Sequence, residues 1–111
     1  MTHNELMAIL AEAEIPVAYD HYAEGESPEP PFICFRYPRS NNFGADGGVY
    51  YKITEANVEL YTDLKNPELE ERVETILDAH NIFYDKSEVW IEKERLYEVL
   101  YSFETGGNAN A

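Results

Sequence analysis

The most informative feature of the sequence is the eleven-residue insert Arg39-Ser-Asn-Asn-Phe-Gly-Ala-Asp-Gly-Gly-Val49, which separates two segments with the pattern of aromatic β-strands. These segments run from Phe32 to Tyr37 and from Tyr50 to Asp63. Because a hairpin turns within about two to five residues, this polar, glycine-rich insert is longer than a turn requires. We interpret residues 39–49 as a flexible hairpin loop that a partner orders on binding. A surface loop without a partner is the alternative.

The strand that follows the insert changes its hydrophobic phase midway. Tyr51 and Ile53 are apolar at odd positions, whereas Ala56, Val58 and Leu60 are apolar at even positions. Strict alternation would send one of the two sets to solvent. The sequence therefore predicts either a bulge near Thr54-Glu55, or a hairpin arm that leaves the core and buries its other face against a neighbour. The second option implies oligomerisation.

Two amphipathic helices are expected on either side of these strands. Thr2 and Glu5 have the spacing of a capping box, which predicts a helix over about 3–13. Asn66-Pro67 is a helix start, so a second helix is expected over about 67–80, with Asn81 as its left-handed cap. Between the first helix and Phe32, the pattern predicts a strand over 17–22 and an exposed connection over 23–31. Pro38 is expected to end the pairing of the second strand.

The C-terminal part is predicted to form strands over 82–86 and 96–104, with another extended piece over 89–91. A helix over 87–101 is the competing interpretation, since Glu, Lys and Leu favour helix there. The alternation of Tyr97, Val99, Tyr101 and Phe103 favours the strand. The resulting order is α-β-β-β-α-β-β in one α+β domain over 1–104, followed by a disordered tail over 105–111.

Composition excludes several classes of protein. The chain has 111 residues with 22 acidic and 8 basic side chains, a formal net charge of -14. This charge repels phosphate backbones, so binding to DNA or RNA is not expected. It suits either solubility or a surface past which DNA slides without sticking. A single cysteine excludes an internal disulfide, and the chain has neither a leader-like N-terminus nor an apolar run of about 20 residues. We therefore expect an intracellular protein that is neither secreted by that route nor inserted in a membrane.

Catalytic, cofactor-binding and metal sites are not expected. The three histidines lack zinc-motif spacing, Cys34 has the pattern of a buried residue, and the acidic run Glu68–Glu74 has the pattern of a solvated helix face. Gly44–Gly48 lacks the lysine and the following helix of a phosphate loop. The loop is then the candidate site, with Phe43 as an apolar anchor. The residues expected to make loop or oligomer contacts are Arg39, Asn42, Phe43, Asp46, Tyr51 and Ile53.

These residues resemble a known family. The resemblance is carried by the predicted order of helices and strands and by five segments of the sequence. These segments are Pro31-Phe-Ile-Cys-Phe35, Asn42-Phe-Gly-Ala-Asp46, Val58-Glu-Leu-Tyr-Thr62, Ile91-Glu-Lys-Glu-Arg-Leu-Tyr97 and Tyr101-Ser-Phe-Glu104. In this combination the chain, from Leu6 to Glu104, resembles the tail-completion or tail-terminator (head-tail joining) proteins of long-tailed bacteriophages and prophages of Gram-positive bacteria. All of the quoted residues are structural, and none is a catalytic motif.

The resemblance implies a mostly antiparallel sheet of four to five strands with two helices packed on one face. It also implies a non-enzymatic virion protein, assembled in the host cytoplasm, that forms a hexameric ring at the head-proximal end of the tail. Its partners would be the tail-tube protein and head-tail connector proteins, and DNA would pass through without specific binding. The alternatives are a head-completion connector or minor tail component, and, in a different class, a cellular peptide-binding module that uses its sheet edge.

Overall fold

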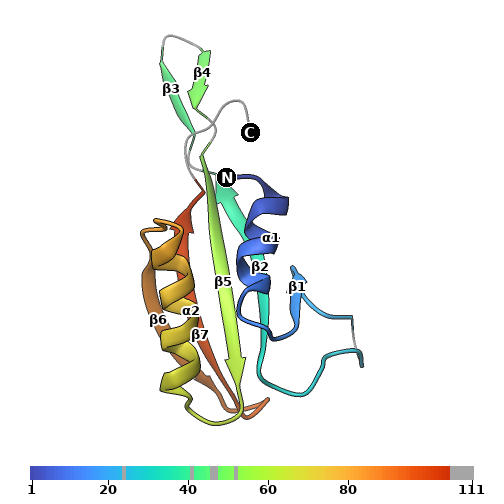
Figure 1. Cartoon of the computed structure of the whole chain (residues 1–111). Helices are drawn as coiled ribbons and strands as arrows, with labels where there is room; N and C mark the ends of the chain where they lie inside the picture. The colour runs from blue at the N-terminus through green and yellow to red at the C-terminus, as the bar shows by residue number, and fades with distance from the viewer. Residues whose placement is uncertain (24, 41, 46–47, 52, 106–111) are drawn as a thin grey trace.

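The computed structural model describes residues 1–23, 25–40, 42–45, 48–51 and 53–105. It is an α+β domain in which a five-stranded sheet is covered on one face by two helices (Figure 1). The sheet order is β1-β2-β5-β7-β6, and every neighbouring pair is antiparallel except β1 and β2. The elements are α1 (His3–Ala11), β1 (Val17–Tyr19), β2 (Phe32–Ser40), β3 (Phe43–Ala45), β4 (Gly48–Tyr51), β5 (Thr54–Thr62), α2 (Pro67–Ala79), β6 (Asp85–Ile91) and β7 (Leu96–Glu104).

The two helices begin where the sequence predicts. The Thr2 side chain accepts a hydrogen bond from the backbone N–H of Glu5 at 3.1 Å, and Asn66 Oδ1 accepts one from the N–H of Leu69 at 3.2 Å. Both bonds satisfy a backbone donor that has no partner within its own helix. Asn81 has a φ of 57°, which confirms the predicted left-handed residue after α2.

The core lies between the helices and one face of the sheet. Leu6 and Leu10 of α1 and Val73 and Leu77 of α2 are buried there. These helix residues pack against alternate residues of β2, β5 and β7, because successive side chains of a strand point to opposite faces of the sheet. These sheet residues are Ile33, Phe35, Ala56, Val58, Leu60, Val99, Tyr101 and Phe103.

Several strand boundaries differ from the prediction. β1 ends at Tyr19 because Asp20 has a positive φ of 69°. The expected end of pairing at Pro38 is wrong, since β2 continues to Ser40. The β2–β5 register shifts between Arg36 and Arg39, and this irregularity accommodates a residue that has no N–H to donate. Residues 82–84 are not in a strand, and one strand, β6, covers the rest of the predicted strand and the extended piece over 89–91.

The phase change after the insert marks a break between two strands. β4 ends at Tyr51, and β5 pairs with β7 without interruption from Glu55 to Thr62. The bulge expected near Thr54-Glu55 is therefore absent from the β5–β7 pairing. The β2–β5 pairing does have a register shift opposite Glu55 and Asn57. As the other option expected, β3 and β4 leave the core and pair with each other in a separate two-stranded sheet that projects from the body (Figure 1), while burial of this hairpin against a neighbour stays a prediction.

The C-terminal strand β7 is confirmed, and the competing helix over 87–101 is wrong. β7 is the hydrogen-bonded neighbour of both β5 and β6. Thr105 follows it and donates both its backbone N–H and its hydroxyl to the Thr54 carbonyl, at 2.9 and 3.0 Å. Residues 106–111 of the predicted tail lie outside the described residues.

Candidate functional site: projecting arm and open sheet face

The arm, defined here as residues 41–53, is joined to the body through the ends of β2 and β5. Ser40 and Thr54 are direct partners across the two strands, and Arg39 is opposite Glu55. Arg39 Nε donates to Glu55 Oε2 at 2.8 Å, and the Ile53 N–H donates to Asn42 Oδ1 at 3.2 Å. The base of the arm is therefore held by polar contacts.

Beyond its base, the arm is a two-stranded ribbon. Phe43 is paired with Tyr51, Gly44 with Val49 and Ala45 with Gly48, with a register shift between the first two pairs. An isolated two-stranded ribbon is marginally stable in water, because its two strands have no third strand or packed layer to bury against. The described part of the ribbon is paired only within itself. A ribbon of this kind gains stability from a surface that covers it.

The structure places the predicted contact residues in two groups. Arg39, Asn42 and Ile53 lie at the base of the arm. Phe43 and Tyr51 are cross-strand partners in the ribbon, whereas Asp46 lies outside the described residues. Their role in contacts between subunits stays a prediction.

The second feature of the candidate site is the sheet face opposite the helices, which sequence reasoning did not identify. The described helices both lie on the other side (Figure 1). The strand registers place the side chains of this face in three cross-strand rows. From the end far from the arm, the rows are Phe32, Tyr61, Glu98 and Val89; Cys34, Glu59, Leu100 and Ser87; and Arg36, Asn57, Ser102 and Asp85. We call these residues the open face.

Aromatic side chains gather at the far end of the open face. The Phe32 and Tyr61 rings stack with centroids 5.1 Å apart, and Tyr22 meets Phe32 edge-on at 5.5 Å. Tyr61 donates its hydroxyl to Glu98 Oε2 at 3.1 Å. This end of the face therefore combines apolar rings with a half-buried carboxylate.

Acidic groups dominate the electrostatics of this face. Glu59 is only 6% exposed, and its cationic neighbour Arg36 lies at 3.6 Å. Burial, and then the charge of Glu98, raise the pKa of Glu59, while Arg36 acts in the opposite direction. Glu98 forms no ion pair with the described residues. A cation that approached Glu98 would relieve the repulsion between the two carboxylates.

Cys34 lies in the middle row, beside Glu59, and is buried as predicted. Burial, and then the Glu59 charge, raise the pKa of its thiol to about 11. The thiol is therefore protonated at neutral pH, and a thiolate nucleophile is disfavoured. Within the described ranges, no group of three or more His, Cys, Asp or Glu side chains has the arrangement of a metal site.

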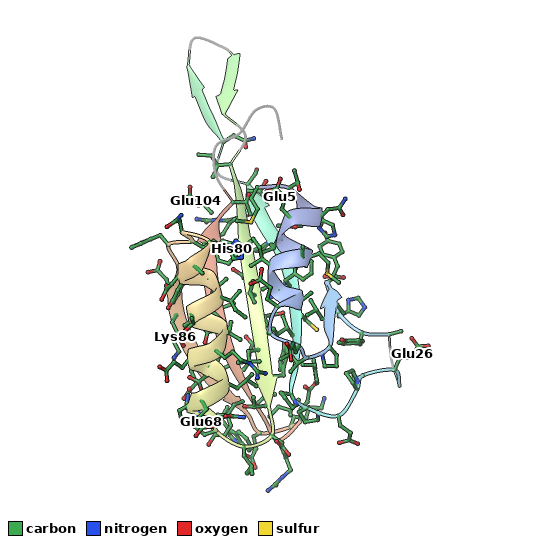
Figure 2. The ribbon with its side chains drawn as sticks, viewed as in Figure 1. Glu5, Glu26, Glu68, His80, Lys86 and Glu104 are labelled. Atoms are coloured by element: carbon green, nitrogen blue, oxygen red, sulfur yellow. The ribbon has the colours of Figure 1, made fainter. Side chains whose placement is uncertain are left out.

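The acidic run on α2 is not uniformly solvated, so that prediction is wrong at Glu70. Glu70 is 4% exposed and pairs with Lys65 at 2.7 Å and with Lys86 of β6 at 3.0 Å. Lys86 also pairs with Glu74 at 2.7 Å and lies beside α2 (Figure 2). Tyr101 donates its hydroxyl to Glu74 at 2.8 Å. This network fastens α2 to the edge of the sheet.

A cleft of about 710 Å³ opens beside the base of the arm. Arg39 and Glu55 line it from the arm side, and Asn81 and Phe83 line it from the connection between α2 and β6. Phe83 is 89% exposed. The lining of this cleft mixes charged, polar and apolar side chains.

The chain matches no family model, and no curated protein matches its sequence. No helix in the described part of the chain is long and apolar enough to cross a membrane.

Proposed function

We propose that the protein is a non-enzymatic structural component of a phage virion, which terminates the tail tube and joins the tail to the head as a hexameric ring. The observation that carries this proposal is the projecting arm, a ribbon without a covering layer of its own. A ring of identical subunits supplies that layer to every arm, because each subunit gives one contact and receives another.

Charge supports the same role. The net charge of -14 leaves the protein poorly suited to hold DNA. A component at the head end of a tail must let the genome pass without retaining it, so an acidic ring meets this requirement. The proposed partners are further copies of the chain, the tail-tube protein and the head-tail connector. The resemblance of the sequence to tail-completion proteins points the same way.

Removing the gene from the phage or prophage that encodes it tests this proposal. Without the protein, we expect tails of uncontrolled length that are not joined to heads, as counted in electron micrographs of lysates. A plasmid copy of the gene should restore joined tails of uniform length. Tails of normal length, joined to heads as often as in the parent phage, would refute the proposal. Uniform but unjoined tails would instead favour the head-completion role.

A different class of function is favoured by the outer edge of β6. This strand lies at the end of the sheet order, and Val89 and Trp90 are 51% and 38% exposed. An extended peptide is able to add to such an edge by main-chain hydrogen bonds. The protein would then bind a cellular partner as a monomer. Stable hexamers in solution would argue against this class of function.

A further inference from the structure

We propose that the arm of one copy docks onto the far half of the open face of the next copy. The receiving surface comprises Tyr61, which stacks on the buried Phe32, together with Glu98 and Leu100. This inference deepens the proposed ring assembly and rests on it in one respect, namely the head-to-tail direction of the contact.

The first argument is charge complementarity. The arm contains one acid, Asp46, and one base, Lys52, and the base Arg39 directly precedes it, in a chain that has 22 acids and 8 bases. It is therefore much less acidic than the rest of the molecule, and it is able to approach an acidic surface with little repulsion. On the open face, Glu98 has a hydroxyl partner but no ion pair with the described residues. A lysine from a neighbouring arm would supply the missing positive charge.

The second argument is the character of the receiving surface. Leu100 and Tyr61 are half-buried, whereas Phe32 is buried and its ring contacts Tyr22 of the connection that follows β1. The arm sequence is rich in apolar groups, with Phe43, Val49 and two tyrosines. Apolar surface on both sides and a carboxylate at the margin form the usual composition of a protein interface with an apolar centre and a polar rim.

The third argument is direction. The receiving row of Tyr61 and Glu98 lies at the end of β5 opposite Thr54, where the arm begins. At about 3.3 Å per strand residue, the two points are roughly 23 Å apart. Arm and receiving surface thus lie at opposite ends of one subunit, so the contact repeats head to tail and is able to close into a ring. If the arm of each copy instead docked into the cleft at the base of the other copy's arm, the contact would be reciprocal and would give a pair of copies.

Two complementary variants isolate this contact. In the first, Asn-Gly replaces residues 41–53. Because Ser40 and Thr54 are direct partners, a two-residue turn closes the β2–β5 hairpin. This arm-less chain is able to receive an arm but not to donate one. In the second, the full chain carries Glu98→Lys, which reverses the charge of the receiving face and leaves the arm intact.

The experiment labels the arm-less chain with ¹⁵N and titrates it with the unlabelled Glu98→Lys chain up to about 1 mM, a concentration that detects even a weak complex. A dispersed amide spectrum verifies that the arm-less chain is folded. We expect shifts at the amides of β2, β5 and β7 around Tyr61, Glu98 and Leu100, which saturate at a ratio of one to one. Absence of shifts, or shifts on α1, on α2 or around Phe83, would overturn the inference.

A charge-matched pair of receivers tests the role of Glu98. Glu98→Lys in the labelled arm-less chain should weaken binding roughly tenfold or more. Glu71→Lys makes the same change of charge at an exposed position of α2 and should leave the affinity unchanged. Equal weakening by both would show that net charge alone governs binding, and would overturn the inference. The tail-joining assay is independent, so the function and the docking site fail separately.

Discussion

The ion network between α2 and β6 gives the sharpest prediction about stability. Lys86→Met removes two ion pairs at once and leaves the buried Glu70 carboxylate with Lys65 as its remaining cation. Loss of one partner from a fully buried pair costs about 3–5 kcal/mol, whereas an exposed pair contributes about 0–1 kcal/mol. The Lys86 side chain is 37% exposed and that of Glu70 is 5% exposed. We therefore expect a loss of about 2 kcal/mol in the free energy of unfolding, between these limits.

Urea unfolding followed by circular dichroism measures this loss as a lower midpoint with an unchanged slope. Lys93→Met is the matched control, because Lys93 is exposed in the turn between β6 and β7 and forms no ion pair with the described residues. A loss below about 0.5 kcal/mol for Lys86→Met, or an equal loss for Lys93→Met, would refute the assigned role of the network.

The same network makes stability depend on pH. Burial alone raises the pKa of Glu70, but the hydrogen bonds and charges of Lys65 and Lys86 outweigh burial and hold this pKa below its ordinary value of 4.5. A carboxyl with a lowered pKa binds fewer protons when folded, so its contribution is present above the unfolded pKa and is lost as the pH falls through the folded pKa. Glu70→Gln should therefore flatten the loss of stability below about pH 4.5. If Glu70→Gln lost stability below about pH 4.5 as steeply as the parent protein, the role given to Glu70 would be contradicted.

Three further predictions concern single residues. Thr62 is 2% exposed and its hydroxyl oxygen has no hydrogen-bond partner among the described residues, so Thr62→Val should leave stability unchanged or raise it by about 1 kcal/mol in urea unfolding. Asn66→Ala removes the N-cap of α2 and should lower the unfolding free energy by about 1 kcal/mol, whereas an exposed alanine substitution at Glu71 should cost much less. Cys34, buried and with a pKa of about 11, should react with a disulfide-exchange reagent at neutral pH only as fast as the protein unfolds, so rapid labelling of the native protein would contradict its position.

Local signals predicted much of the fold. The caps at Thr2 and Asn66 and the left-handed Asn81 depend on near neighbours in the chain, and the structure confirms them. The order of helices and strands follows from hydrophobic periodicity, whereas the mostly antiparallel sheet was expected from the family resemblance. The passage of β2 beyond Pro38 was missed, because a register shift against a distant strand leaves no mark in the local sequence.

Long-range contacts account for what the sequence did not predict about the site. Glu70 flanks the buried stripe of α2, and it is buried because Lys86, on a strand that follows the helix, meets it there. The open face likewise depends on strand order, which brings Glu59 beside Leu100 and Tyr61 beside Glu98. The unusual length of the insert, by contrast, was visible from residue types alone. It correctly drew attention to the segment that leaves the body.

In the proposed ring, the arm joins one subunit to the next, and a complementation experiment tests this role. In a phage that lacks the gene, the arm-less version with Asn-Gly in place of residues 41–53 is supplied from a plasmid and compared with the full-length gene. Both proteins should accumulate as soluble, folded chains. We predict that only the full-length protein restores tails of uniform length joined to heads, as counted by electron microscopy. If the arm-less protein restored joined tails as often as the full-length protein, the proposed role of the arm in assembly would be contradicted.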